Sequence, residues 1–338
     1  MIQRRKPLKA LFQICLVIST VFSLSAQADL VVYTDRNPAQ FATAVEEFEK
    51  LTGEKAVLVM MSNYKAIVDR LQMEKDLTHA DMVIIKDLIY FKDLKNKGLL
   101  QGFEETSVLK TVPSFMRGMN NEWVALSMRA RTFVYNPTFL SRSDLSSYDD
   151  LADPKWEGLL CLRTSNSSYN FALVSGFIEH YGLEKTKSIL EGWMANLAQE
   201  VFPNDTSIIQ AIAEGKCAVG IVNHYYYAGM KDRDPSLPVE IAFANQGQGG
   251  VFTNGTAAAL LKTADNKALA QKFVEVMLSE RNQLAISAAH FDFPAVEGLQ
   301  PNTLIKEWGA FERNPLSWDV FADHLSEAKS LFEEVGYN

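Results

Sequence analysis

Residues 29–61, DLVVYTDRNPAQFATAVEEFEKLTGEKAVLVMM, decide the fold of this chain. The stretch begins with a short apolar run that ends in polar residues, as a buried strand does. Its middle part carries apolar residues at helical spacing and ends at Gly53, which is a helix stop. These apolar residues are Phe41, Ala44, Val45 and Phe48. A second apolar run at 55–61 completes a strand–helix–strand unit, which predicts a parallel sheet.

The same alternation of strands and helices continues along the chain. It predicts a helix at 64–76, a strand at 80–87 and a helix at 88–98, followed by a long extended run at 122–137. A second α/β set follows that run. Its predicted elements are a strand at 158–164, helices at 169–182, 185–198 and 206–215, and a strand at 217–225. Further strands within 238–263, a long amphipathic helix at 264–287 and a helix at 319–335 are predicted after it. A chain of 338 residues exceeds a typical single domain, so we expect two α/β lobes with a cleft between them.

The first 28 residues have the pattern of a secretory signal. Four basic residues precede the apolar stretch at 10–24, and small residues stand at Ala26 and Ala28. This pattern predicts a signal peptide over 1–28, removed before Asp29. Losing its four positive charges takes the formal net charge from −8 to −12. So acidic a mature chain argues against nucleic acid or an anionic membrane as partner.

Cysteine usage agrees with export to an oxidising compartment. Cys15 lies in the predicted signal, which leaves Cys161 and Cys217 as an even pair. Each of them precedes a tyrosine, Tyr169 or Tyr225, by eight residues. The compartment favours a disulfide between the two cysteines, and two buried free thiols are the alternative.

The sequence lacks the common catalytic signatures. It contains no GxSxG, HExxH or GxxxxGK[ST] motif, and its five histidines are scattered without metal-ligand spacing. A hydrolase would need a nucleophile beside a base, and nothing pairs visibly with Ser165 or Ser168, whose structural role would be helix capping. We therefore expect a binding protein and no enzyme.

Three predicted strand ends carry polar and aromatic residues. VNHYYYAG at 222–229 ends one strand, TSNSSYN at 164–170 ends another, and VVYTDR at 31–36 ends the first. Taken alone, the tyrosine run is typical of aromatic packing at a strand end. If the strand alternates regularly, His224 points away from Tyr225. The carboxyl ends of parallel strands are where ligands bind, and all three stretches fall there.

Two longer stretches give a family resemblance. ADPKWEGLLCLRTSNSSYNFALV at 152–174, followed by AIAEGKCAVGIVNHYYYAGM at 211–230, resembles the periplasmic ferric-ion-binding proteins of bacterial ABC importers. MRARTFVYN at 128–136 is similar to the crossing between the two lobes in that family. The resemblance spans about residues 30–300. It implies the two-lobed periplasmic binding protein fold, an α/β class with a central interlobe cleft.

The resemblance also implies lobe boundaries and iron ligands. The implied N-terminal lobe comprises 29–129 plus 253–303, and the C-terminal lobe 130–252 plus 304–338. In the family a "YN" segment and an "N-x-Y-Y" segment bring three tyrosines to one ferric ion. Here those positions are Tyr169, Tyr225 and Tyr226, and Tyr227 is an extra aromatic residue.

The chemistry of Fe(III) supports the same ligands. A hard trivalent ion favours anionic oxygen over thiolate, whereas imidazole suits zinc or copper better. A free phenol keeps its proton up to a pKa of ~10, and a bound cation lowers that value by stabilising the anion. Three phenolates neutralise the three charges of the ion.

One departure from the family predicts an anion as a further ligand. Many members carry a histidine or His-Tyr after the first strand, where this chain has Asn37 and Pro38. Members without that histidine complete the shell with carbonate or another small anion held by arginine. The candidates are Arg36 and Arg129, since a guanidinium matches carbonate in shape. Arg131 could assist, but a salt bridge is the favoured role for it.

The sequence therefore predicts a periplasmic solute-binding protein that carries ferric iron, with a small anion, to an inner-membrane ABC permease. We expect it to be monomeric. A binder of another small solute, an anion or a polyamine, is the main alternative, in which the tyrosines stack on an organic ligand. A periplasmic hydrolase is a more distant one.

Overall fold

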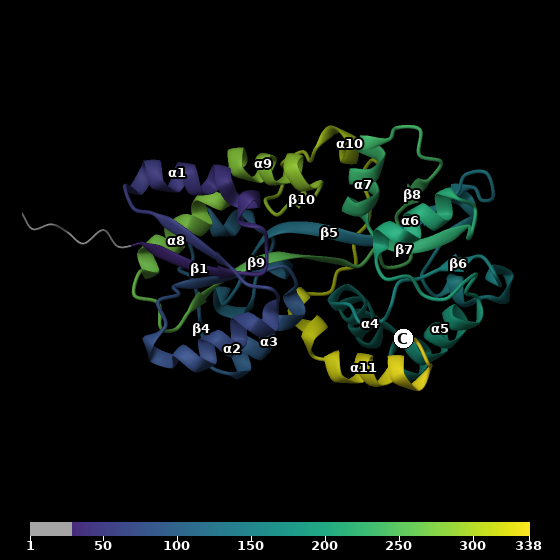
Figure 1. Ribbon diagram of the computed structural model, residues 1–338, viewed down its shortest axis with the longest axis horizontal. Helices are drawn as coiled ribbons and strands as arrows, with labels where there is room; N and C mark the ends of the chain where they lie inside the picture. The colour runs from purple at the N-terminus through teal and green to yellow at the C-terminus, as the bar shows by residue number, and fades with distance from the viewer. Residues whose placement is uncertain (1–28) are drawn as a thin grey trace, which may run out of the picture.

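The computed structural model describes residues 29–338, and the predicted signal peptide lies outside the described residues. The chain forms two α/β lobes side by side, with the strands β5 and β9 running between them (Figure 1). One lobe holds β1–β4, α1–α3, α8 and α9, and the other holds β6–β8, α4–α7 and α11. Within the described residues, no helix is long and apolar enough to span a membrane. The two-lobed α/β fold that the sequence predicts is confirmed.

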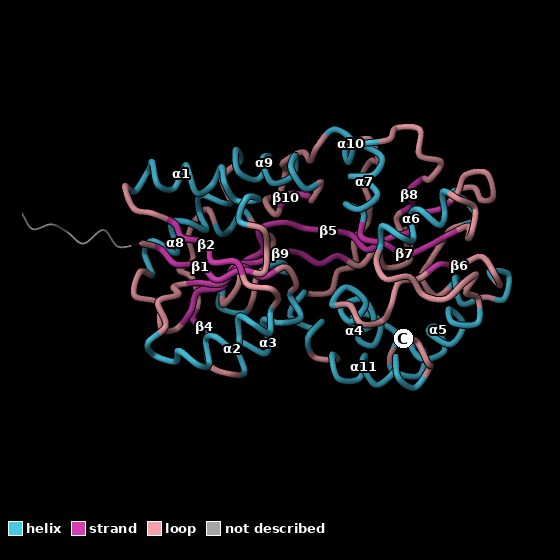
Figure 2. The backbone as a smooth tube through the Cα atoms, in the orientation of Figure 1, coloured by secondary structure: helices cyan, strands magenta, loops and turns pink. Residues whose placement is uncertain are grey.

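The elements follow the strand–helix alternation of the sequence (Figure 2). The strands are β1 (Leu30–Thr34), β2 (Ala56–Met60), β3 (Met82–Ile85), β4 (Leu100–Gln101), β5 (Val124–Tyr135), β6 (Leu160–Cys161), β7 (Val219–Asn223), β8 (Glu240–Ala242), β9 (Thr253–Leu261) and β10 (Phe293–Pro294). The α-helices are α1 (Ala42–Thr52), α2 (Tyr64–Glu74), α3 (Phe91–Asn96), α4 (Ser168–Tyr181), α5 (Leu183–Ala195), α6 (Asp205–Ala213), α7 (His224–Arg233), α8 (Lys267–Met277), α9 (Glu280–His290), α10 (Thr303–Lys306) and α11 (Leu325–Glu334). Two short 3-10 helices also matter below: η3 (Leu88–Tyr90) and η10 (Trp318–Ala322).

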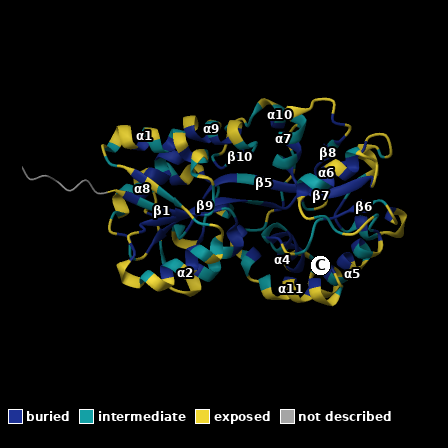
Figure 3. Ribbon diagram, in the orientation of Figure 1, coloured by how far each residue is buried: buried dark blue, intermediate teal, exposed yellow. Residues whose placement is uncertain are grey.

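The strands are hydrogen-bonded in the order β2-β1-β3-β9-β5-β7-β6. The outer strands are parallel, because β1 pairs with β2 and β3 in parallel and β6 pairs with β7 in parallel. The two middle strands β9 and β5 are antiparallel to their neighbours. The strands β1, β3, β5, β7 and β9 are largely buried beneath the helices, as their nearly continuous apolar sequences require, whereas the edge strand β2 is partly exposed (Figure 3).

A single strand, β5, belongs to both lobes. Its residues up to Ala130 pair with β9, and from Arg131 onward they pair with β7. The second connection runs beside it, since the backbone N–H of Arg131 donates to the carbonyl oxygen of Phe252 at 3.1 Å. Two adjacent extended segments thus join the lobes, and the chain crosses once more between α9 and α11. Arg129 and Arg131 lie on either side of the change of partner along β5.

The disulfide expected from the cysteine pair is present. Cys161 is the last residue of β6, and Cys217 lies two residues before β7. Their sulfur atoms are bonded, and their Cα atoms are 6.0 Å apart. Because β6 and β7 are neighbouring parallel strands, the bridge joins the two strands that lead towards Tyr169 and Tyr225.

The helix predicted at 264–287 is in fact two helices, α8 and α9, with a break at Leu278–Ser279. The side-chain amide of Asn282 donates to the carbonyl oxygen of Val276 at 2.9 Å. The amide of Gln283 does the same for Met277 at 2.9 Å. These amides satisfy carbonyl groups at the end of α8, so the chain can turn without leaving buried acceptors unpaired. Apolar spacing alone does not reveal such a side-chain cap.

The strand predicted at 217–225 is also too long. β7 ends at Asn223, and the tyrosine run forms the first turn of α7. The ring of His224 is buried between β5 and the segment that follows α9: its Nδ1 accepts from the backbone N–H of Ala130 at 3.0 Å, and its Nε2 is 2.7 Å from the carbonyl oxygen of Phe291. This tertiary contact overrides the strand preference of aromatic residues. The predicted alternation of His224 and Tyr225 across a strand is therefore wrong.

Candidate metal centre

Two tyrosines from different segments meet at one point of the C-terminal lobe. The hydroxyl of Tyr225 donates to the hydroxyl oxygen of Tyr169 at 3.1 Å. The ring of Tyr226 lies against that of Tyr225, with the ring centroids 4.5 Å apart. All three rings are partly buried. The structure thus brings together Tyr169, Tyr225 and Tyr226, the residues predicted as iron ligands.

Each of these tyrosines lies in the first turn of a helix. Tyr169 follows Ser168 at the start of α4, where the Ser167 hydroxyl accepts from the Tyr169 backbone N–H at 3.3 Å and caps the helix. Tyr225 and Tyr226 lie in the first turn of α7. Helix N-termini carry partial positive charge, which stabilises nearby anions. The helical geometry also separates the three consecutive tyrosines by about 100° each, so Tyr227 points into the core, where it is 2% exposed.

The surroundings keep the isolated phenols protonated. Burial raises the pKa of Tyr225 well above its ordinary value, and the neighbouring Tyr169 and Tyr226 raise it further. Burial likewise raises the pKa of Tyr226 to about 12. Arg129 opposes the shift of Tyr225. Because desolvation and neighbouring phenols disfavour the phenolates of Tyr225 and Tyr226, a strongly charged cation would be needed to stabilise them at neutral pH.

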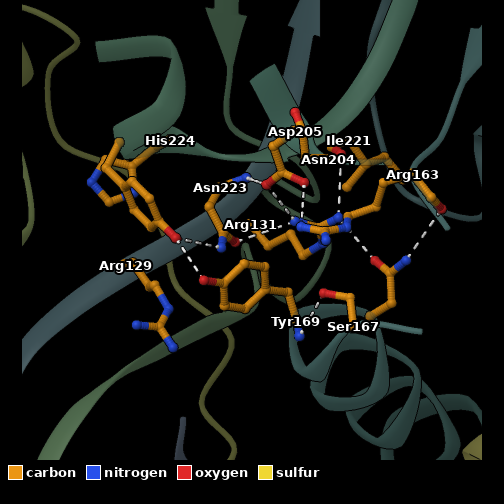
Figure 4. Close-up of polar contacts among 12 residues, drawn as sticks. Arg129, Arg131, Arg163, Ser167, Tyr169, Asn204, Asp205, Ile221, Asn223 and His224 are labelled. Atoms are coloured by element: carbon orange, nitrogen blue, oxygen red, sulfur yellow. Dashed lines mark hydrogen bonds and ion pairs between the residues drawn. The ribbon is translucent and has the colours of Figure 1, made fainter. Parts of the chain in front are cut away.

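Arg129 reaches the tyrosines from the connecting strand. Its side chain is 2% exposed, and its guanidinium carbon lies 5.3 Å from the centroid of the Tyr169 ring (Figure 4). On its other side it forms an ion pair with Asp87 at 3.5 Å and donates to the carbonyl oxygen of Lys86. Arg129 therefore places a positive charge beside the tyrosines while being held by the lobe that contains β3.

Arg36 lies two residues beyond the end of β1 and is partly exposed. Its backbone N–H donates to the Thr34 hydroxyl at 3.0 Å. Its charge lowers the pKa of the half-buried His290, second to burial itself. Among residues 29–338, the Nε of Arg36 is buried without a hydrogen-bond partner. Unlike Arg129, Arg36 makes no hydrogen bond or cation–π contact with the three tyrosines in the described part of the chain.

Arg131 has a structural role, which confirms the salt bridge favoured for it. It is bonded to Asp205 at 3.0 Å and to Asn170 at 2.8 Å. Asp205 is fully buried and also pairs with Arg163 at 3.1 Å. The same carboxylate accepts the backbone N–H of Asn223 at 2.8 Å. Figure 4 shows this network beside Tyr169, above it and to its right in the view.

Sequence reasoning missed two groups of residues near the tyrosines. Asn223 donates to the Tyr225 hydroxyl oxygen at 3.3 Å, and it precedes the tyrosine run in the N-x-Y-Y segment, so the motif itself was the available signal. The other is Tyr90, the last residue of η3. The element η3 packs against α4. Its ring stacks on Tyr64 with the centroids 4.1 Å apart. Burial raises the pKa of Tyr90, and nearby Asp87 adds to the shift. No sequence pattern marked Tyr90.

The neighbouring histidine, His224, is not available as a metal ligand. Both ring nitrogens of His224 are engaged by backbone groups, and burial lowers its pKa, so its imidazole is neutral. Within the described residues, no group of three or more His, Cys, Asp or Glu side chains could hold a metal ion. Phenol oxygens and arginines are therefore the distinctive groups of this site, a donor set that suits a hard cation with an anion.

Fold and site together define a two-lobed solute-binding protein. Residues 78–323 match the family model of the bacterial extracellular solute-binding proteins, and the chain belongs to that family. The family is one of solute-binding proteins and not of enzymes.

Named relatives of this chain are proteins of iron uptake. It is 28% identical over 319 residues to iron uptake protein A1 of Synechocystis, covering 92% of this chain and 88% of that protein. It is 24% identical to the major ferric iron-binding protein of Neisseria meningitidis, covering 92% and 94%. Among solved structures, a Trichodesmium protein (IdiA, FutA) in complex with iron and citrate has a TM-score of 0.87 at 28% identity, covering 92% of this chain and all of the other. Ferric iron-binding protein A of Mannheimia haemolytica, in an open conformation, has a TM-score of 0.83 at 32% identity, covering 91% and 98%.

Proposed function

We propose that the protein binds ferric iron in the cleft through the phenolate oxygens of Tyr169, Tyr225 and Tyr226. The observation that carries the proposal is the 3.1 Å contact between the hydroxyls of Tyr169 and Tyr225, with Tyr226 against them. Oxygen atoms this close can share one small cation. The iron-binding relatives of similar length support the choice of cargo.

The protonation of the tyrosines explains how the protein could both hold ferric iron and release it. Fe(III) displaces the phenolic protons because its charge outweighs the burial that keeps the free phenols neutral. Asn223, which donates to the Tyr225 oxygen, stabilises the resulting anion. Acidification restores the protons and so opposes iron binding.

A small anion completes the coordination in this proposal. Three phenolates leave about three positions of a six-coordinate ion open. Arg129 lies beside the tyrosines and Arg36 has an unpartnered buried Nε, so the two arginines are the cationic partners for carbonate or a similar anion. Citrate is an alternative anion, because it is bound with iron in the Trichodesmium relative.

The remaining assignments follow from the same function. We assign 29–129 plus 253–303 to the N-terminal lobe and 130–252 plus 304–338 to the C-terminal lobe; the change of partner along β5 between Ala130 and Arg131 supports this division. The protein acts as a monomer in the periplasm after removal of residues 1–28, and it delivers iron to an inner-membrane ABC permease.

The visible spectrum tests the proposal. Purified protein is titrated with Fe(III) in bicarbonate buffer, and in parallel with Zn(II). We expect a phenolate-to-iron charge-transfer band that saturates at one Fe(III) per chain, and no band with Zn(II). A chain that binds no Fe(III), or binds it without that band, would refute tyrosinate ligation.

A further inference from the structure

A buried tyrosine near the end of the described chain contacts the loop that carries Tyr169. Tyr337 is 2% exposed. Its hydroxyl donates to the carbonyl oxygen of Arg163 at 2.8 Å and accepts from the side-chain amide of Asn170 at 3.3 Å. Arg163 precedes Tyr169 by six residues, and Asn170 follows it directly. One hydroxyl group therefore bridges the two ends of the segment 163–170.

Further contacts hold the same segment against α11. The backbone N–H of Ser165 donates to the backbone oxygen of Asn338 at 3.3 Å. The Tyr337 ring packs edge-on against Phe332, with the centroids 5.0 Å apart, and Phe332 in turn contacts Phe171 of α4 at 5.8 Å. Both sides of Tyr169 in the sequence are thus attached to residues that follow α11.

Asn170 connects these contacts to the lobe connection. Its amide nitrogen also donates to the carbonyl oxygen of Thr164 at 3.0 Å, which closes the turn before α4. Its amide oxygen accepts from Arg131 at 2.8 Å. All polar atoms of the Asn170 side chain are therefore used in fixing the start of α4, and Tyr337 is the member of this set that comes from a distant part of the sequence.

We propose that Tyr337 is a positioning residue of the metal centre, which fixes the Tyr169 phenol relative to Tyr225. The proposal rests on the proposed function, because it takes Tyr169 as a ligand. Ligand oxygens must be held within fractions of an ångström for tight binding, and a loop held at both ends meets this need better than a free one. Without the Tyr337 hydroxyl the ring still fills its place in the core and Asn170 still bonds to Thr164, but the segment 163–170 loses the hydrogen bonds that attach it to the residue after α11.

The test compares two matched substitutions, Tyr337→Phe and Tyr181→Phe. Tyr181 is the last residue of α4, and its hydroxyl likewise accepts from a buried amide, that of Asn245, at 3.0 Å. The readouts are iron release to a competing chelator, the charge-transfer band and the urea midpoint of the iron-free protein. For Tyr337→Phe we expect release about five- to tenfold faster, as the loss of a hydrogen bond or two implies, and a weaker or shifted band. Tyr181→Phe should release iron as fast as the parent does. Its urea midpoint should be similar to that of Tyr337→Phe.

Tyr169→Phe separates a failure of this inference from a failure of the proposed function. If Tyr169→Phe keeps the parent's iron affinity and band, Tyr169 is not a ligand and the proposed function is wrong at that residue. If Tyr169→Phe loses iron while Tyr337→Phe behaves as Tyr181→Phe does, the function stands and the positioning role is overturned.

Deletion of Asn338 provides a second variant in case Tyr337→Phe fails to fold. The deletion removes the acceptor of the Ser165 N–H and keeps the Tyr337 ring. Release faster than that of Tyr181→Phe supports positioning of Tyr169 through attachment of its segment to the residues after α11, and release equal to it overturns that attachment as the source of positioning.

Discussion

The hydroxyl groups of Tyr169 and Tyr225 are hydrogen-bonded to each other at 3.1 Å, although 56 residues separate them in the sequence. Two buried phenols paired in this way satisfy each other in the absence of a cation. If a ferric ion takes both oxygens as ligands, as proposed, the hydrogen bond between them is lost together with both phenolic protons. In the proposed function, the same pair is hydrogen-bonded in the absence of iron and provides two ligands in its presence.

Replacing Tyr225 or Tyr226 with Phe should weaken Fe(III) binding severely and leave the fold intact. Each substitution deletes one anionic oxygen and keeps the packed ring. Competition with a chelator measures the affinity, and circular dichroism checks the fold. Tyr227→Phe is the control, because that ring is buried in the core against Trp308, 5.7 Å between centroids. Parent-like affinity in both Tyr225→Phe and Tyr226→Phe would contradict the ligand assignment.

Arg36→Ala should weaken iron retention more in bicarbonate than in citrate buffer. Bicarbonate needs a cationic partner in the cleft, whereas citrate brings its own chelating carboxylates. The measurement is iron release in each buffer, with bicarbonate removed and then restored. Arg142→Ala, at an exposed position, is the control. If Arg36→Ala and the parent retain iron equally in every buffer, the iron ligands do not include an anion held by Arg36.

Asp205→Asn should destabilise the protein by about 3 kcal/mol or more, because two arginines would lose their buried counter-charge. Asp205 is fully buried and pairs with both Arg131 and Arg163. Urea unfolding should show a lower midpoint with an unchanged slope. Asp234 is exposed, and its carboxylate accepts from the backbone N–H of Ser236. Asp234→Asn should leave the midpoint nearly unchanged. A parent-like midpoint for Asp205→Asn would mean that the ion pairs contribute nothing net.

Loss of the Cys161–Cys217 disulfide should lower the stability by about 2–4 kcal/mol. The bridge joins strands β6 and β7 and closes a long loop. The comparison is urea unfolding of the protein with and without reductant, alongside the double variant Cys161→Ser/Cys217→Ser. The denatured, unreduced mature protein should show no reactive thiol. Two titratable thiols in that experiment would rule the bridge out.

The iron-free protein should become less stable as the pH falls below about 6.5, in part through His290. Burial lowers the pKa of His290, Arg36 lowers it further, and Asp292 acts in the opposite sense. Between the ordinary and the lowered pKa the unfolded chain binds more protons than the folded one, so the free energy of unfolding decreases as the pH falls. Urea unfolding at pH 7.5 and 5.5 measures this change.

His290→Gln should show a smaller loss between the two pH values than the parent. His79→Gln, at an exposed position, should show the same loss as the parent. An undiminished loss in His290→Gln would assign the pH dependence to other groups.

The parts of the molecule that follow from local pattern were predictable from the sequence. Apolar spacing and helix stops revealed the alternation of strands and helices, and the export signal with two remaining cysteines indicated the disulfide. The motifs at 164–170 and 222–229 singled out Tyr169, Tyr225 and Tyr226, which the structure brings together.

What the sequence could not reveal depends on contacts between distant residues. The tyrosine run has the composition of a strand, yet it forms a helix because His224 is held by Ala130 and Phe291. Asp205 lies 74 residues from Arg131, and no local pattern links an acidic residue before a helix to an arginine on a crossing strand. Tyr90 reaches α4 only through the packing of the two lobes.

The contact between Tyr337 and Arg163 also bears on the order in which the protein is made. The two residues are 174 positions apart, so the segment around Tyr169 is synthesised long before its partner. Contacts at such separation form late, because a large loop must first be closed. A nascent or partly translocated chain thus has the tyrosines but lacks the bond that bridges their loop. On the proposed function, the metal centre is fully assembled only when the lobe that holds α11 is complete.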